Sequence, residues 1–141
     1  MLSFPFSLRG YAFDRLTMDI FRHELSANTI NLHYTLSDPD AYGIREAEPS
    51  FGSLDPDAAG DERAYLEKCR RKLSRCLKGG LNEEDRLTAE ILDWWLGGQL
   101  EAEEYYYYQE PLGPTLGVQA QLPVLLAEFP FRREEDIRPY L

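Results

Sequence analysis

The spacing of apolar residues along the chain predicts a mainly α-helical protein. Apolar side chains recur every three to five positions near the start, at Phe13, Leu16, Ile20 and Leu25. The residues between them are largely polar or charged. Because such spacing places the apolar residues near one face of a helix, we expect a first helix over about residues 13–25, packed on a core.

The pattern is less clear in the next segment. Residues 28–36 mix β-branched, aromatic and polar side chains, and they fit either a short helix or an extended run. Asp38-Pro39-Asp40 marks a helix start or a turn, because proline suits the first position of a helix. Glycine and proline recur between residues 43 and 60, which we expect to be the main loop or linker.

The clearest prediction is an antiparallel helix hairpin over about residues 55–104. Asp55-Pro56-Asp57 can open its first helix, and Gly79-Gly80 can end it. Its apolar stripe comprises Leu66, Cys69, Leu73, Cys76 and Leu77. Asn82 then caps a second helix, with Asp85 in the position of a capping box. We expect the apolar face of this second helix to comprise Leu87, Ile91, Trp94, Trp95 and Ala102.

The charges of the two hairpin helices are opposite. Residues 63–78 carry seven basic side chains and one acid, a net charge of +6, whereas residues 83–104 carry eight acids and one base, a net charge of −7. A short connection makes the helices antiparallel neighbours, so the two charged stripes attract each other. The alternative use of the basic run is to bind an external acidic partner.

The two cysteines of the chain lie on this hairpin. Cys69 and Cys76 are seven residues apart, about 10 Å along a helix axis, which a disulfide does not bridge. They form no Cys-x-x-Cys pair, so nothing indicates a zinc site. We expect both to be thiols packed in a core.

The C-terminal third is an apolar segment broken by glycine and proline. Four consecutive tyrosines, residues 105–108, end the acidic helix, and four in a row do not all face one core. A stiff loop over residues 111–117 precedes residues 118–129, which are apolar except for Gln119, Gln121 and Glu128. We expect other protein to cover most of this run. Acidic residues after Arg132-Arg133 indicate a last helix start.

Composition excludes several classes of function. The 141 residues have a net charge of −10, which disfavours sequence-independent binding to nucleic acid or to anionic lipid. No segment approaches the roughly 18 to 20 continuous apolar residues that span a bilayer, so we expect no membrane span. The first nine residues lack a basic leader, which suggests a cytoplasmic protein.

No catalytic or metal-binding motif is complete in the sequence. His23-Glu24 begins the zinc-peptidase pattern H-E-x-x-H, but Ala27 stands where the second histidine is needed. His33 is the only other histidine, and a catalytic zinc site ordinarily takes three protein ligands. Among the carboxylates, Glu110 and Glu128 stand out by their apolar neighbours. We therefore expect no catalytic residue and no metal ligand in this chain.

Two blocks of sequence resemble a bacterial family called domain of unknown function 885. They are residues 32–44, LHYTLSDPDAYGI, and residues 110–131, EPLGPTLGVQAQLPVLLAEFPF, preceded by the tyrosines. The resemblance implies a long, mostly helical and often exported protein, similar to gluzincin zinc metallopeptidases. The family's H-E-x-x-P-G-H motif has no counterpart here. The chain thus resembles the N-terminal part of such a protein, as one helical segment over residues 1–141.

The resemblance also implies a role for the second block. It is expected to pack beside the missing C-terminal catalytic region and to line a cleft for a peptide substrate, with Tyr108, Glu110, Gln119 and Gln121 as polar groups. Alternatively, both glutamines satisfy buried backbone groups between helices. Zinc would belong to the complete protein, and the family's habit of export leaves the location open.

A different class of function fits the same residues. The chain can be a small helical protein–protein interaction module without catalysis, whose apolar C-terminal segment docks on a partner. If that segment instead packs against missing helices, the isolated chain should self-associate or bind the dye ANS. Continuation of the gene in frame to an H-E-x-x-P-G-H segment would distinguish the first hypothesis from this one.

Overall fold

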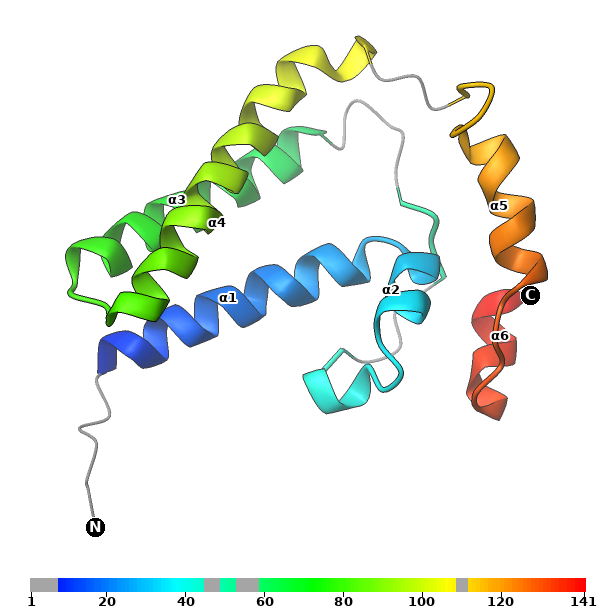
Figure 1. Ribbon diagram of the computed structural model, residues 1–141, viewed down its shortest axis with the longest axis horizontal. Coiled ribbons are helices and arrows are strands. Elements are labelled where there is room, and N and C mark those ends of the chain that lie inside the picture. The colour runs from blue at the N-terminus through cyan, green and yellow to red at the C-terminus, as the bar shows by residue number, and fades with distance from the viewer. Residues whose placement is uncertain (1–7, 45–48, 53–58, 109–111) are drawn as a thin grey trace. The chain divides into compact units, whose positions relative to one another are not determined.

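The computed structural model describes residues 8–44, 49–52, 59–108 and 112–141 (Figure 1). The secondary structure of these residues is helical and includes no strand, as the sequence predicts. The α-helices are α1 (Leu8–Ser26), α2 (Thr29–Thr35), α3 (Ala59–Lys78), α4 (Glu83–Ala102), α5 (Val118–Ala127) and α6 (Ile137–Tyr140). Short 3-10 turns are η1 (Asp40–Tyr42), η3 (Glu103–Tyr108) and η4 (Glu134–Asp136). Among the described residues, no helix is long and apolar enough to cross a membrane.

The chain divides into two compact units. Unit 1 contains described residues 8–21 and 59–105, and unit 2 contains described residues 22–44, 49–52, 106–108 and 112–141. Helix α1 contributes its first part to unit 1 and its last turns to unit 2. That residues 1–141 belong to a longer helical protein stays a prediction.

Unit 1 is built on a core shared by three helices. The buried cluster comprises Phe13, Leu16 and Ile20 of α1, Leu66, Cys69 and Leu73 of α3, and Ala89 and Leu96 of α4. The expected apolar stripe of α3 is therefore confirmed, with Cys76 and Leu77 packed at the edge of the cluster. The expected stripe of α1 joins the cluster except for Leu25, which is also buried but belongs to unit 2. Both cysteines are free, and burial raises the pKa of the Cys76 thiol.

The predicted hairpin is present as α3 and α4, which run side by side in Figure 1. Its proposed opening residues, 55–57, lie outside the described part of the chain, and α3 is described from Ala59. Asn82 caps α4 by accepting a 2.8 Å hydrogen bond from the Asp85 backbone N–H. The Asp85 carboxylate in turn accepts from the Asn82 side-chain amide at 2.8 Å, so the two residues pair reciprocally.

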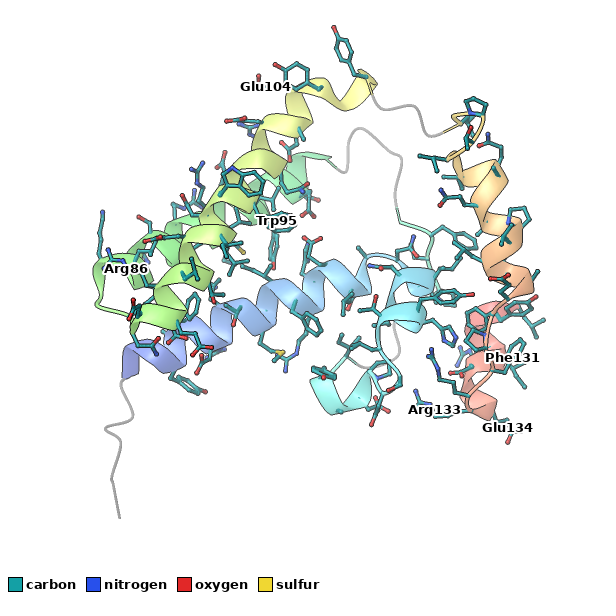
Figure 2. The ribbon with its side chains drawn as sticks, in the orientation of Figure 1. Arg86, Trp95, Glu104, Phe131, Arg133 and Glu134 are labelled. Atoms are coloured by element: carbon teal, nitrogen blue, oxygen red, sulfur yellow. The ribbon has the colours of Figure 1, made fainter. Side chains whose placement is uncertain are left out.

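The structure corrects the predicted apolar face of α4. Leu87, Ile91 and Trp94, which the sequence placed in the core, are 61%, 57% and 80% exposed. The core face instead comprises the fully buried Ala89 and Leu96, with Leu92, Leu100 and Trp95 packed against the cluster (Trp95 is labelled in Figure 2). Of the predicted face only Trp95 packs there, and Ala102 is exposed. Both faces of α4 carry apolar residues, so spacing alone does not select the buried one.

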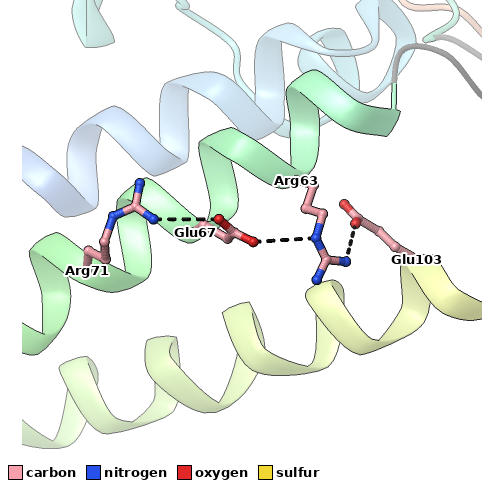
Figure 3. A network of polar contacts seen from close by, with 4 residues as sticks. All are labelled: Arg63, Glu67, Arg71 and Glu103. Carbon is pink, nitrogen blue, oxygen red and sulfur yellow. Dashed lines mark hydrogen bonds and ion pairs between the residues drawn. The ribbon is translucent and has the colours of Figure 1, made fainter.

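Basic side chains of α3 form ion pairs with acids of α4 and of η3, which follows it. Arg63 contacts Glu103 at 3.1 Å, and Arg70 contacts Asp93 at 3.0 Å. Glu67 lies between two arginines of its own helix, 3.4 Å from Arg63 and 3.5 Å from Arg71 (Figure 3). The basic run thus has partners within unit 1, although each such exposed pair contributes only about 0–1 kcal/mol.

Candidate functional site

A groove in unit 2 is the candidate functional site. It has a volume of about 520 Å³ and lies among α2, the segment around Phe51, and α5. Its apolar lining comprises Ile30, Phe51, Val118, Leu122 and Leu125, and its polar lining comprises Asn28, Asn31, Tyr34 and Gln121. Among the residues that the structure describes, the polar lining consists of amides and one phenol and includes no histidine, cysteine or carboxylate.

Asn28 fixes one end of the groove. Its side-chain oxygen accepts a 3.0 Å hydrogen bond from the Asn31 backbone N–H and so caps α2, which settles the ambiguous segment 28–36 as a helix. Its side-chain nitrogen donates to the Phe51 carbonyl at 2.9 Å. The Thr29 backbone N–H also donates to the Ser50 carbonyl at 2.8 Å. These bonds hold the Phe51 segment against the N-terminus of α2.

Tyr34 joins the two helices of the groove. Its hydroxyl donates to the Leu125 carbonyl at 2.7 Å. Leu125 lies in the last turn of α5, where a helix leaves its carbonyls without partners from its own backbone. The hydroxyl therefore satisfies a carbonyl that the end of α5 exposes, and it sets the separation of α2 and α5.

An aromatic cluster supports the far end of α2. The His33 ring stacks on the Phe129 ring, with centroids 3.7 Å apart, and its Nε2 lies 3.0 Å from the Pro130 carbonyl. That carbonyl only accepts, so Nε2 carries the proton. Phe131, labelled in Figure 2, and Tyr140 pack around Phe129, with centroids 5.3 and 5.2 Å away.

Arg132 caps the C-terminus of α2. Its guanidinium donates to the His33 carbonyl at 2.7 Å and to the Leu36 carbonyl at 3.4 Å. A cation at this end of a helix is favourable, because the last carbonyls carry partial negative charge. Burial, followed by the charge of Arg132, lowers the pKa of His33, although the Pro130 carbonyl and Asp136 oppose this shift.

Asp136 orders the chain that carries Arg132. The residue is 8% exposed, and its carboxylate accepts hydrogen bonds from the backbone N–H groups of Arg132 at 2.8 Å and Arg133 at 3.1 Å. Burial alone would raise the pKa of Asp136, but the two backbone hydrogen bonds, with the nearby charges of His33 and Arg133, lower it. Asp136 is therefore an ionised anchor for this turn.

The loop before α5 is closed by Gln119. Its side-chain amide donates to the Leu112 carbonyl at 3.1 Å and to the Gly113 carbonyl at 2.8 Å. The Gly117 backbone N–H donates to the same Gly113 carbonyl at 2.9 Å. A Cβ on Gly117 would lie 2.7 Å from the Gly113 nitrogen and would also collide with Gln119, so the loop needs glycine there.

The four cleft candidates from the sequence fall into different places. Gln121 lines the groove, whereas Gln119 satisfies carbonyls of the preceding loop. Tyr108 is 82% exposed in η3 and is not among the groove residues. Glu110 lies outside the described residues.

Sequence reasoning missed five groove residues from the earlier segments: Asn28, Ile30, Asn31, Tyr34 and Phe51. The first four follow from reading residues 28–36 as a helix, because positions 30 and 31 then each neighbour position 34 and Asn28 caps the helix. Phe51 carried no such signal, since a hydrogen bond to Asn28 in a distant segment places its backbone.

The side chains that line the groove can form hydrogen bonds and make apolar contacts. Amide side chains donate and accept hydrogen bonds, as a peptide backbone does, and the apolar lining offers contacts for side chains. Across the described residues, no three His, Cys, Asp or Glu side chains are grouped so as to hold a metal ion. Of the two histidines, His23 lies in the last turn of α1, and the Nε2 of His33 lies 3.0 Å from the Pro130 carbonyl.

Comparison with known proteins found no family model, no curated protein and no solved structure that matches the chain.

Proposed function

We propose that this chain is the N-terminal helical scaffold region of a zinc-dependent peptidase-like protein, and that its unit 2 groove forms part of the peptide-binding cleft. The observation that carries the proposal is the composition of the groove, whose described lining combines five apolar residues with amide side chains and includes no acid. Both sequence blocks that resemble the domain of unknown function 885 family contribute to the groove, through Tyr34 from the first and Gln121 from the second.

Gln121 is the residue best suited to bind a peptide in this groove. No hydrogen bond of its side chain is recorded within the described part of the chain, whereas both Asn28 side-chain atoms are already engaged with α2 and Phe51. A free amide can pair with both the N–H and the carbonyl of one peptide unit. The apolar residues beside it, such as Leu122 and Val118, would contact the neighbouring side chains of the peptide.

The described residues do not fit a zinc site, so zinc would be held by other parts of the complete protein. The role proposed for this chain is therefore limited to binding and orienting the peptide. Reading the gene beyond Leu141 is the first experiment. An in-frame H-E-x-x-P-G-H segment supports the proposal, and a stop codon directly after Leu141 contradicts it.

The second experiment uses the full-length protein and a peptide that it cleaves. Gln121→Ala should raise KM about two- to tenfold at nearly constant kcat, because one hydrogen bond to bound substrate is worth about 0.5–1.5 kcal/mol. Gln99→Ala is the matched control, since Gln99 is an exposed amide on α4. Equal KM values for the two variants would show that the groove is not part of the peptide-binding cleft.

A second candidate function is a small helical interaction module. The observation that favours it is α5, a ten-residue helix with no charged residue and no buried residue. Such a helix is unusual on a protein surface without a partner. If the natural chain ends at Leu141 and is a stable monomer, this candidate replaces the first. Self-association of the isolated chain, or binding of the dye ANS, would instead favour a missing catalytic region.

A further inference from the structure

An apolar stripe on the outer face of α4 is not used by the groove. It comprises Leu87, Ile91 and Trp94, which are 61%, 57% and 80% exposed. The groove residues belong to unit 2, whereas this stripe belongs to unit 1. A partner that binds the stripe would therefore bind a surface distinct from the proposed peptide cleft.

Helix geometry places the stripe directly opposite the core. At about 100° per residue, positions 87, 91 and 94 lie within roughly 60° of one another. The buried Ala89 and Leu96 lie about 180° away from them. The stripe therefore points away from α1 and α3, and the packing of unit 1 does not account for it.

Acidic side chains border the stripe. By the same geometry, Glu83, Glu90 and Glu101 follow one edge and Glu84 the other, and all four are exposed. Arg86 pairs with Glu90 at 3.3 Å, and both side chains remain mostly exposed (Arg86 is labelled in Figure 2). No ion pair of Glu83 or Glu84 is recorded among the residues that the structure describes. The result is an apolar strip within a negative surface.

We propose that this face of α4 docks an amphipathic helix of another protein, whose apolar side is bordered by lysine or arginine. Three apolar residues at positions i, i+4 and i+7 match the anchors by which one helix binds along another. Basic residues at the border of the partner would pair with Glu83, Glu84 and Glu101, which increases the rate and the specificity of association.

The charges argue against a second copy of the chain as the occupant. Two α4 faces brought together would oppose segments that each carry −7. The outer side of α3 on a second copy is positive, since it carries the exposed Lys68, Lys72 and Arg75. It offers no apolar residues in that row, so docking there would leave the apolar stripe of α4 without apolar contacts. Helix α5 is apolar but has no charge to pair with the acids. An anionic lipid surface would be repelled by the same acids.

The test uses a synthetic amphipathic peptide of leucine and lysine, about 18 residues long, and a control peptide in which glutamate replaces every lysine. The wild-type chain should bind the leucine–lysine peptide, shift its tryptophan emission to the blue as Trp94 becomes buried, and bind less tightly as salt increases. It should not bind the leucine–glutamate peptide.

Two variants with the same charge change locate the binding face. Ile91→Lys should weaken binding of the leucine–lysine peptide at least about tenfold, because it places a cation in the centre of the contact. Gln99→Lys, on the same helix but off the stripe, should stay within about threefold of wild type. Helical circular dichroism checks that both variants remain folded.

Three results would overturn the proposal. They are equal loss of affinity in the two variants, equal binding of the two peptides, and wild-type self-association that Ile91→Lys abolishes. The last result would identify a second copy as the occupant. None of them depends on peptidase activity, so failure here leaves the proposed groove untouched.

Discussion

The choice of buried face on α4 can be tested by removing the same atoms from opposite sides of the helix. Leu96 has 0% exposure and lies in the core of unit 1, whereas Leu87 is 61% exposed. Leu96→Ala and Leu87→Ala delete identical groups and gain the same small increase in helix propensity. Any difference between the two variants therefore measures burial.

The expected magnitudes differ severalfold. Burial of a leucine side chain is worth about 1.5–3 kcal/mol, and the cavity left in a core such as this one adds to the loss. Leu96→Ala should therefore lower the free energy of unfolding by about 3–5 kcal/mol. Leu87→Ala should change it by no more than about 0.5 kcal/mol, as for other surface substitutions.

Tryptophan fluorescence during urea unfolding is the appropriate assay. The chain has two tryptophans, Trp94 and Trp95, and both lie on α4, so their emission reports on unit 1. If Leu96→Ala is too unstable to measure, Ile20→Val tests the same core with an expected loss of about 0.5–1.5 kcal/mol. Losses for Leu87→Ala that equal those for Leu96→Ala would refute the assignment of the buried face.

Three further predictions concern unit 2 and the glycines. Arg132→Ala should lower the stability of α2 by about 1 kcal/mol, seen as faster amide hydrogen exchange there, because it removes the donor to the His33 and Leu36 carbonyls; unchanged exchange would contradict the cap. The pKa of His33 is lower in the folded chain, so as pH falls the unfolded chain takes up a proton at a higher pH than the folded chain does. Unit 2 should therefore lose stability as pH falls below about 6.5, and His33→Gln should abolish this loss of stability. The pKa of Asp136 is also lower in the folded chain, so protonation of this carboxylate causes a separate loss of stability only below about pH 3.8. Gly117→Ala should destabilise unit 2 by steric collision, whereas Gly98→Ala, with open space around it, should stabilise α4 by about 0.5–1 kcal/mol; comparison of the two melting curves checks both.

The sequence was most informative where local signals and long-range packing agree. The Asn82 cap, the glycine stop after Lys78 and the Leu66–Cys69–Leu73 stripe depend on the local sequence alone, and the structure has all three. The face of α4 was predicted wrongly because its two sides are both apolar, and only contacts with α1 and α3 select Leu96 over Leu87.

The groove was harder to predict because distant segments build it. Gln121 could be selected as a polar residue within an apolar run, but the groove also needs residues 28–34 and Phe51, which lie about 70 to 93 positions earlier in the chain. The Tyr34 bond to the Leu125 carbonyl leaves no pattern in either segment, since the acceptor is a backbone atom that every residue has.

Those long-range bonds also set an order of events while the chain is being made. The acceptor of the Tyr34 hydrogen bond, the Leu125 carbonyl, is synthesised 91 residues later, and the Pro130 carbonyl that His33 binds is synthesised 97 residues later. At about 5–20 residues per second, a ribosome needs roughly 5–20 s to supply these partners. The hairpin of α3 and α4 forms from neighbouring residues and can be complete within that interval. During those seconds, segment 28–44 lacks the residues that later cover its aromatic rings. A ribosome that stalls before Pro130 would therefore leave unit 2 unfolded in a chain whose hairpin is already folded.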